Sequence, residues 1–314
     1  MPGPHVGIPE PLPTGTPGQL GHGVRAALAT SGTAVVHGSL DAWLPGPGRT
    51  GPALRRLLGR DWQRYQRIPL PRMRERFAAS RLLLRHVAGA AIDAAPESVD
   101  LSYQPGGRPY VRGCDQIDVS LSHTDEMLVV GVTRRGRIGV DVERRARRMA
   151  GTGSESQTCT PFERARLDPV DMRVRNDTLV RLWTLKEAYT KALGQGLRLR
   201  FTEFGFALRA DGACLTGPAG EPAGEPDWSF GTFHLPGDYV VGAAVHDAGL
   251  GAGSDLSTLT ALDEGMLDAL LGAASTSGDP AGFLRDADRV DPVTGMQFGH
   301  DGGKVIPHRS LGEV

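Results

Sequence analysis

The chain has 314 residues, enough for one large domain or for two of ordinary size. Its 35 basic and 36 acidic residues give a formal net charge of −1, so no global field draws it to nucleic acid or to an anionic membrane. The three cysteines lie far apart and form no C-x-x-C pair, which argues against a disulfide framework and a thiolate zinc site. Because the net charge is close to zero, we expect no nucleic-acid partner.

The N-terminus lacks the basic start and the apolar run of a signal peptide, and no apolar stretch approaches the roughly 20 residues that span a bilayer. We expect a cytoplasmic monomer with no membrane partner. Glycine (43 residues) and proline (23 residues) are abundant, which indicates linker segments. We expect residues 1–23 to form a disordered tail and residues 250–314 an extension of unknown role, with one helix at about 258–273.

The first part of the ordered chain is expected to begin with a strand at 33–37 and to continue with an Arg-rich helical pattern over 51–91. A proline-marked break near 68–71 divides this helical pattern. Short apolar runs then predict strands, with a turn at 134–136 before the last of them. The predicted strands are 99–103, 109–112, 117–122, 127–133 and 137–143.

A basic and then Gly/Ser-rich loop is expected at 144–160. A short helix at 161–167 follows, with Thr160 as its N-cap and Pro161 in its first position. The strongest helical pattern covers 177–193 and ends at Gly194.

Strands are then predicted at 201–208, 228–234 and 239–245. A helix followed by strands therefore occurs twice, around 70–133 and around 177–245. This order permits two similar α+β halves.

Two carboxylates lie close together in the predicted strand at 137–143. Because side chains alternate along a strand, Asp141 and Glu143 should project from one face while Val140 and Val142 face the core. A hard divalent cation, Mg²⁺ above all, would relieve the repulsion between the carboxylates. The alternative is a solvent-exposed acidic face that the arginines at 144–148 neutralise.

The predicted helix at 177–193 carries a polar stripe beside its buried face. Trp183, Glu187 and Lys191 fall at i, i+4 and i+8. The alternative is an ordinary Glu–Lys surface pair. Lysine is rare in this chain, with three lysines against 32 arginines, and Lys186 and Lys191 lie only five residues apart. A retained lysine suggests a site that needs a compact ammonium.

Together these segments resemble the paired signature of the Sfp-type 4′-phosphopantetheinyl transferases. Gly-Val-Asp-x-Glu at 139–143 is followed by Trp-Thr-x-Lys-Glu-Ala-x-x-Lys at 183–191. Further family blocks precede them in the family order, and the resemblance covers roughly residues 60–245. These blocks are Arg76-Phe77 with Leu82-Leu83-Leu84-Arg85, Gly107-Arg108-Pro109 where the family has Gly-Lys-Pro, and Leu121-Ser122-His123.

The resemblance implies an α+β fold of two structurally similar halves, related by pseudo-twofold symmetry, with the active site in the cleft between them. The N-terminal half, residues 24–136, would bind the 3′-phosphate and adenine of coenzyme A. The C-terminal half, residues 137–249, would carry the metal and the catalytic groups. The implied reaction is that of a holo-[acyl-carrier-protein] synthase, which transfers 4′-phosphopantetheine from coenzyme A to a serine hydroxyl of an apo carrier protein and releases 3′,5′-ADP.

The resemblance also implies roles for the acidic side chains. Asp141, Glu143 and Glu187 would hold Mg²⁺, with Mn²⁺ as a substitute. Glu187 would act as the general base, directly or through water, with its pKa held low by the metal. Lys191 would contact the phosphates. Lys186 would either contact a phosphate or hold the residues that form the site.

Coenzyme A would be bound by basic and polar residues at positions that match the family blocks or lie on the neighbouring basic helix. An arginine fork suits a phosphate dianion. The alternative for the helical arginines is a solvated basic face, and for His123 a satisfied polar side chain at a strand end. The candidate residues are Arg64, Arg67, Arg76, Arg108, Pro109, Ser122, His123 and Lys191.

The partner would be an apo acyl or peptidyl carrier protein, and the dense arginine suggests polyketide or nonribosomal peptide biosynthesis. The 144–166 segment departs from the family, which carries an apolar helix with paired aromatics there. The arginines at 144–148 could attract an acidic carrier, or they form a plain solvated loop. Two other functions remain open, namely a Mg²⁺-dependent pyrophosphate hydrolase and a non-catalytic module that binds coenzyme A or a carrier.

Overall fold

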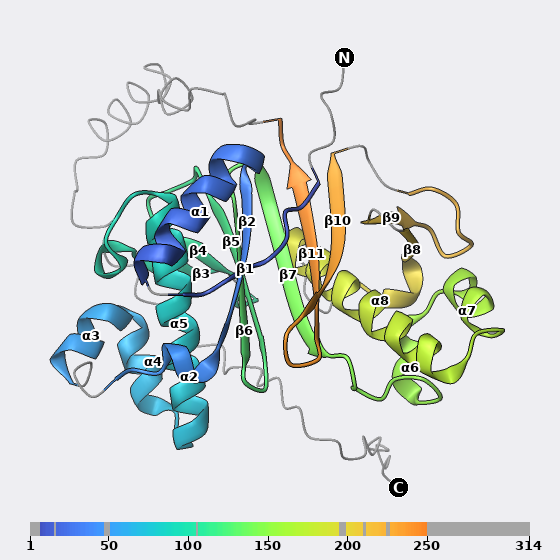
Figure 1. Ribbon diagram of the computed structural model, residues 1–314, viewed down its shortest axis with the longest axis horizontal. Coiled ribbons are helices and arrows are strands. Elements are labelled where there is room, and N and C mark those ends of the chain that lie inside the picture. Colours follow the sequence, from blue (N-terminus) through green and yellow to red (C-terminus); the bar gives the residue numbers. More distant parts are fainter. Residues whose placement is uncertain are drawn as a thin grey trace, which may run out of the picture. The chain divides into compact units, whose positions relative to one another are not determined.

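A computed structural model describes residues 7–15, 17–46, 51–104, 106–194, 199–209, 212–223 and 227–249. These residues form a mixed helix-and-sheet fold of the predicted α+β class (Figure 1). The extension 250–314, with the helix predicted at 258–273, lies outside the described residues. No helix in the described part of the chain is long and apolar enough to cross a bilayer.

The N-terminal half contains a sheet with the strand order β1-β2-β6-β5, and β3 and β4 form a separate antiparallel pair. The strands are β1 (Leu12–Pro13), β2 (Thr33–Ser39), β3 (Leu101–Tyr103), β4 (Pro109–Val111), β5 (Asp118–Thr124) and β6 (Met127–Thr133). The helices are α1 (Pro17–Ser31), α2 (Leu40–Trp43), α3 (Pro52–Leu58), α4 (Asp61–Arg67), α5 (Pro71–Ala91) and the 3₁₀ turn η1 (Pro96–Ser98).

The C-terminal half contains a sheet with the strand order β10-β11-β7, and β8 and β9 form a separate antiparallel pair. The strands are β7 (Gly136–Arg144), β8 (Gly205–Arg209), β9 (Gly212–Thr216), β10 (Trp228–Leu235) and β11 (Tyr239–Asp247). The helices are α6 (Gly153–Thr158), α7 (Pro161–Leu167), α8 (Met172–Leu193) and the 3₁₀ turn η3 (Phe201–Glu203).

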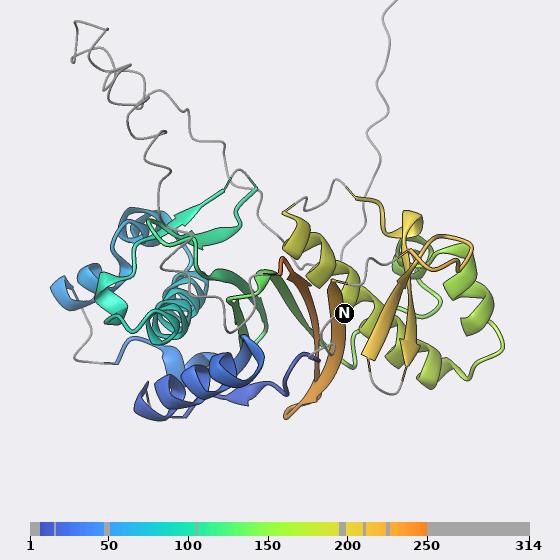
Figure 2. The same ribbon diagram turned by 90° about the horizontal axis from the view of Figure 1, so that it is seen from above.

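The two sheets share a connection pattern. In each, an early strand (β2 or β7) pairs with the second strand of a later antiparallel hairpin (β5–β6 or β10–β11). In each, a long helix (α5 or α8) and a small two-stranded pair come between the early strand and the hairpin. Figure 2 shows α1 and α5 beside the β2 sheet and α8 beside the β7 sheet.

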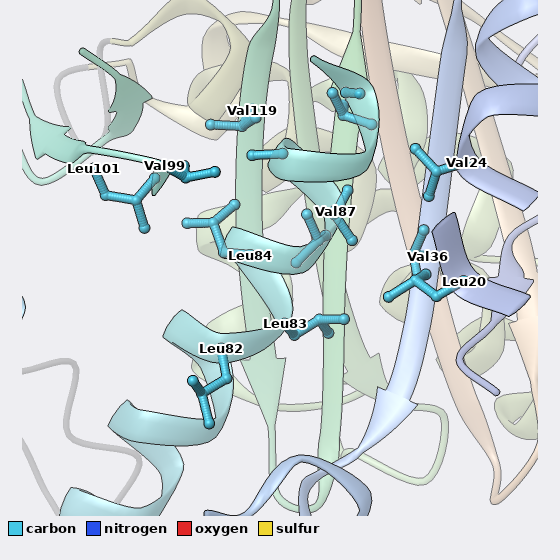
Figure 3. Close-up of a cluster of buried hydrophobic side chains, with 14 of the residues drawn as sticks. Leu20, Val24, Val36, Leu82, Leu83, Leu84, Val87, Val99, Leu101 and Val119 are labelled. Atoms are coloured by element: carbon cyan, nitrogen blue, oxygen red, sulfur yellow. The ribbon is translucent and has the colours of Figure 1, made fainter. Parts of the chain in front are cut away.

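The core of the N-terminal half lies between its helices and one face of its sheet. Leu20 and Val24 of α1, Leu83 and Val87 of α5, and Val36 of β2 are all nearly or fully buried in this cluster (Figure 3). The side of α5 that carries Leu83 and Val87 is therefore a packing face. A second cluster fills the C-terminal half around α8 and an aromatic group that includes Tyr189, Phe206 and Phe230.

A third apolar cluster joins the two sheets through their opposite faces. Val35 of β2 and Val129 of β6 lie in it together with Val140 and Val142 of β7. The prediction that Val140 and Val142 face a core is confirmed. Their burial leaves the other face of β7 to α8.

Side chains of β5 also satisfy the backbone of β7. Buried backbone amides need a hydrogen-bond partner, and β7 and β5 belong to different sheets. Alternate side chains of β5 accept from alternate amides of β7. The pairs are Ile138 N to Asp118 Oδ2 (2.7 Å), Val140 N to Ser120 Oγ (3.1 Å) and Val142 N to Ser122 Oγ (3.3 Å).

The structure differs from the sequence prediction at the N-terminus. Residues 1–23 were expected to be disordered, but β1 and the start of α1 lie in this segment. The helix packs Leu20, Val24 and Leu28, at i, i+4 and i+8, into the first core. Burial of this stripe offsets the poor helix propensity of the neighbouring glycines.

Other elements differ less. The strongest predicted helix begins at Met172 rather than 177, because the side chain of Asp171 caps it, and it ends at Gly194 as predicted. The capping box of Thr160 and the first-turn Pro161 of α7 are confirmed. The expected loop at 144–160 contains α6, and β9 was not predicted.

Two glycines allow α8 to lie directly on the second sheet. A Cβ on Gly139 of β7 would lie 1.8 Å from the carbonyl oxygen of Ala188, and a Cβ on Gly242 of β11 would lie 2.4 Å from the carbonyl carbon of Thr184. Gly242 pairs with Asp141 across the sheet. The glycines therefore set the distance between the acidic face of β7 and the polar stripe of α8.

We expect Gly139→Ala to lower the free energy of unfolding by about 2–3 kcal/mol, because the added methyl group forces α8 away from β7. Urea denaturation measures this change. Gly153→Ala is the matched control, since a Cβ there meets nothing within 4 Å. Equal stability of the two variants would contradict the close-packing account.

Candidate active site at strand β7 and helix α8

The predicted carboxylates of β7 lie on the face that α8 covers. Asp141 and Glu143 are both buried, with relative exposures of 8% and 6%. Glu187 projects from α8, and the charge of Asp141 acts on it. We call Asp141, Glu143 and Glu187 the carboxylate cluster.

Asp141 is held by a lysine and a serine. Its Oδ1 accepts from Lys191 Nζ at 2.6 Å and from Ser122 Oγ at 2.8 Å. The same ammonium lies 3.1 Å from Ser122 Oγ and donates to the carbonyl of Val140 at 3.2 Å. Predicted residues of β5, β7 and α8, distant in sequence, thus meet at one carboxylate.

Glu143 is held by the segment that follows it. Its Oε1 accepts from the backbone amide of Arg144 at 2.8 Å, and its Oε2 accepts from Arg147 Nη1 at 2.5 Å. The guanidinium of Arg147 also lies over the ring of Trp183, 4.5 Å from its centroid. Arg147 was not among the predicted site residues.

Glu187, the member of the carboxylate cluster on α8, has a raised pKa. Burial, and after it the negative charge of Asp141, raises the pKa of Glu187 to about 7. The positive charges of Lys191 and Arg147 oppose this rise. The pKa expected for Glu187 beside a metal was low, and a bound cation would act in that direction.

The donor chemistry of the carboxylate cluster fits a hard divalent cation, because carboxylate oxygens are the ligands that Mg²⁺ prefers. Burial and the negative charge of Asp141 raise the pKa of Glu187, so they disfavour its charged form unless positive charge lies near it. In the described residues, however, no group of three His, Cys, Asp or Glu side chains is placed so that it could hold a metal ion. Lys191 and Arg147 supply the positive charge here instead.

The structure does not bring Lys186 to the carboxylate cluster. Lys186 is fully buried, and its Nζ lies 2.7 Å from Glu163 Oε2. It also donates to the carbonyls of Thr158, Phe201 and Phe204 at 2.7–2.8 Å. The enclosed ammonium of Lys186 therefore links α8 to the segments that supply these acceptors. Lys186 is not placed to contact a phosphate at the carboxylate cluster, which was one of the roles expected for it.

Basic residues gather around His123 at the exposed end of β5. His123 has solvent-accessible surface, but many protein atoms surround its ring. Desolvation by these atoms is the main cause that lowers the pKa of His123 to about 4. The positive charges of Arg76, Arg81 and Lys191 act in the same direction. A neutral histidine among three cations is a setting suited to an anion.

Aromatic rings hold the arginines of this region. Arg81 lies over the rings of Phe77 and Tyr103, at 4.6 Å and 5.2 Å, and Arg64 lies over the same rings at 5.6 Å and 6.0 Å. The buried Nε of Arg76 has no hydrogen-bond partner among the described residues. Such an orphaned donor is costly unless a ligand or water satisfies it.

The remaining predicted residues have varied environments. Arg67 is exposed on α4. The side chain of Arg108 donates to the carbonyl of Ile138 at 2.9 Å, to Asp118 and to the carbonyl of Lys191, so it joins the turn before β4 to β7 and α8. Pro109 begins β4 and is half-buried.

Sequence reasoning missed Arg81 and Arg147. Arg81 follows Phe77 by four residues on α5, a spacing that places an arginine over a ring, so a signal was present. Arg147 belongs to the arginines at 144–148 that were considered as neutralising partners of an acidic face, but nothing in the sequence singles it out as the partner of Glu143.

Comparison with known proteins agrees with this geometry. Residues 137–244 match the family model described as the 4′-phosphopantetheinyl transferase superfamily. Residues 137–244 form a 4′-phosphopantetheinyl transferase superfamily domain. The matched range contains the whole carboxylate cluster and Lys191, so the resemblance inferred from the sequence motifs is confirmed.

Curated proteins to which this chain is similar carry the same family name. It is 28% identical to a putative 4′-phosphopantetheinyl transferase of Synechocystis over 43% of this chain and 54% of that protein. It is 27% identical to the 4′-phosphopantetheinyl transferase of Bacillus subtilis over 42% of this chain and 57% of that protein. It is 29% identical to the 4′-phosphopantetheinyl transferase HetI of Nostoc over 60% of this chain and 77% of that protein. The chain thus spans little more than half the length of the first two.

Proposed function

We propose that this chain transfers the 4′-phosphopantetheine arm of coenzyme A to a serine hydroxyl of an apo acyl or peptidyl carrier protein, with release of 3′,5′-ADP. The observation that carries this proposal is the ion pair of Asp141 with Lys191 inside the transferase-superfamily domain, where the charge of Asp141 also acts on Glu187. The relatives named as 4′-phosphopantetheinyl transferases support it.

The carboxylate cluster is the proposed site of Mg²⁺, for which Mn²⁺ would substitute. The bound cation would neutralise the oxygens of the pyrophosphate that is broken in the reaction. Asp141 and Glu143 would bind it from β7 and Glu187 from α8. The hard oxygen donors support this assignment.

Glu187 is the proposed general base. Its carboxylate would accept the proton of the serine hydroxyl, directly or through one water, as the hydroxyl attacks the β-phosphate. Lys191 would stabilise the phosphate charge, because its ammonium already lies within the same group of side chains. Lys186 would support the reaction only by fixing α8.

Coenzyme A would place its 3′-phosphate among the basic residues near His123. Arg76 and His123 would contact it, with Ser122 beside them, and Arg64 and Arg67 would add positive charge from α4. The orphaned Nε of Arg76 and the cations around His123 support this placement. The adenine would lie near the 107–109 turn and Pro109, although the side chain of Arg108 is engaged with Asp118 and Ile138.

We also propose that the two halves are related by a pseudo-twofold axis, with the site in the cleft between them. The common connection pattern of the two sheets supports this relation. The protein would act in the cytoplasm as a monomer.

The surface beside the 144–148 arginines is the proposed docking site of the carrier protein. A recess of about 710 Å³ lies there, and Arg145, Arg148, Met172 and Arg173 are among its lining residues. Arg145 is paired with Asp177, whereas no ion pair within the described residues engages Arg148 or Arg173. Met172 is 60% exposed, so the recess offers an apolar contact in addition to its arginines.

We expect the double variant Arg148→Glu/Arg173→Glu to raise KM for an acidic carrier about 5–30-fold, which corresponds to about 1–2 kcal/mol, with kcat nearly unchanged. Steady-state kinetics with varied carrier concentration measures it. Arg25→Glu/Arg55→Glu reverses two exposed charges on α1 and α3 as the control. An equal rise of KM in both double variants would contradict docking at this recess.

The reaction is tested by following coenzyme A and 3′,5′-ADP chromatographically with and without an apo carrier. A transferase releases 3′,5′-ADP only when the carrier is present. Release without a carrier would indicate a pyrophosphate hydrolase. Calorimetric binding of coenzyme A without turnover on any carrier would indicate a binding module.

A further inference from the structure

Arg147 binds one oxygen of the carboxylate of Glu143, a proposed metal ligand. Its Nη1 lies 2.5 Å from Glu143 Oε2, and the side chains are 24% and 8% exposed. The other oxygen, Oε1, accepts from the amide of Arg144. Both oxygens of this carboxylate therefore have a donor from the chain itself.

The guanidinium is fixed from several sides. It lies 4.5 Å from the ring centroid of Trp183, the first residue of the polar stripe on α8. The backbone carbonyl of Arg147 accepts from Asn176 Nδ2 at 2.9 Å, and Asn176 Oδ1 accepts from the amides of Met149 and Ala150. α8 thus anchors the segment that carries Arg147, so the contact with Glu143 is built into the fold.

The charge of Arg147 also acts on a second member of the carboxylate cluster, Glu187. A divalent cation bound between Glu143 and Glu187 would lie next to the guanidinium, and like charges repel at such distances. It would also have to share the carboxylate of Glu143 with Arg147. Binding of the metal and the Arg147–Glu143 ion pair therefore oppose each other.

We propose that Arg147 is an internal counter-cation of the carboxylate cluster, which competes with the divalent cation for Glu143 and so weakens metal binding. The inference rests on the metal site proposed above. Arg147 neutralises Glu143 when no metal is bound and is released from it when a metal enters, while its ring contact with Trp183 keeps it near. Arg147 is thus a positioning residue that sets the metal affinity.

The test is direct binding of Mn²⁺, measured by electron paramagnetic resonance of free Mn²⁺ on the full chain without coenzyme A or carrier. We expect Kd of Arg147→Gln to fall about tenfold, equal to about 1.4 kcal/mol, and that of Arg147→Lys to stay near the wild-type value. Arg147→Met keeps an apolar contact with Trp183 without the charge and should behave like Arg147→Gln. Arg148→Gln, an equal charge change at the exposed neighbour, is the control and should leave Kd unchanged.

An unchanged or higher Kd in both Arg147→Gln and Arg147→Met would overturn the inference, because Arg147 would then merely orient Glu143. An equal fall in Arg148→Gln would overturn it too, since general electrostatics would explain the effect. Asp141→Asn separates the two proposals. If wild-type binding is not weakened by Asp141→Asn, the metal site itself is wrong, whereas binding that depends on Asp141 but not on Arg147 refutes this inference alone.

Discussion

Replacing Glu187 by glutamine is expected to slow phosphopantetheine transfer about 10²–10⁴-fold, the range for loss of a general acid or base. The amide keeps the size of the side chain but cannot accept the proton of the serine hydroxyl. It also removes one charged oxygen donor from the proposed metal site. Initial rates with saturating coenzyme A, carrier and Mg²⁺ measure the loss.

The fold should survive this change, because the Glu187 carboxylate is half-buried and burial disfavours its charged form. Glu203→Gln provides a matched control, since Glu203 is exposed in η3 outside the carboxylate cluster. A Glu187→Gln variant with nearly the wild-type rate would exclude Glu187 as the base.

Replacing Glu163 by alanine is expected to lower the free energy of unfolding by about 3–5 kcal/mol, the usual cost of leaving a buried charge without its partner. Lys186 is 0% and Glu163 1% exposed at the side chain, with Nζ and Oε2 2.7 Å apart. Burial lowers the pKa of Lys186, and the charge of Glu163 opposes that shift. Without Glu163 the ammonium would keep the backbone carbonyls and the ring of Phe204 as neighbours but would lose the carboxylate that neutralises its charge.

Glu163 has further partners that alanine would lose. Its Oε2 accepts from the amide of Thr160 in the capping box of α7, and its Oε1 accepts from the amide of Phe206. Urea denaturation measures the change. Asp100→Ala, which breaks an exposed ion pair with Arg60, is the control and should alter stability little.

A double variant refines the second prediction. Lys186→Met/Glu163→Leu removes both charges and should recover part of the stability lost in Glu163→Ala, because no buried charge then remains unpaired. If Glu163→Ala is as stable as the Asp100→Ala control, the pair does not hold α8 in the way described.

The acidic face of β7 was predictable because it depends on a local rule. Alternation along a strand places Asp141 and Glu143 on one side whatever the rest of the fold does. The cap and first turn of α7 were predictable for the same reason, since Thr160 and Pro161 act within a few residues of themselves.

The environment of Lys186 was not predictable from its helix. A helical stripe assigns a side chain to a face, but the acceptors of Lys186 come from residues as distant in sequence as Thr158 and Phe204. The same limit applies to Arg147, whose position depends on Asn176 of α8. The α1 helix was missed because the high glycine and proline content of the segment suggested disorder. The helical spacing of Leu20, Val24 and Leu28, which pack into the core, was the signal that indicated a helix.

Intact-mass spectrometry of apo carrier proteins tests the proposed reaction most directly. Fatty-acid, polyketide and peptide-synthetase carriers would each be incubated with the full chain, coenzyme A and Mg²⁺. At least one carrier should gain the mass of phosphopantetheine, and the gain should disappear with EDTA or with Asp141→Ala, which removes the carboxylate that Lys191 and Ser122 now hold. A gain that persists in EDTA and in Asp141→Ala, or no gain on any carrier, would contradict the proposed reaction at this site.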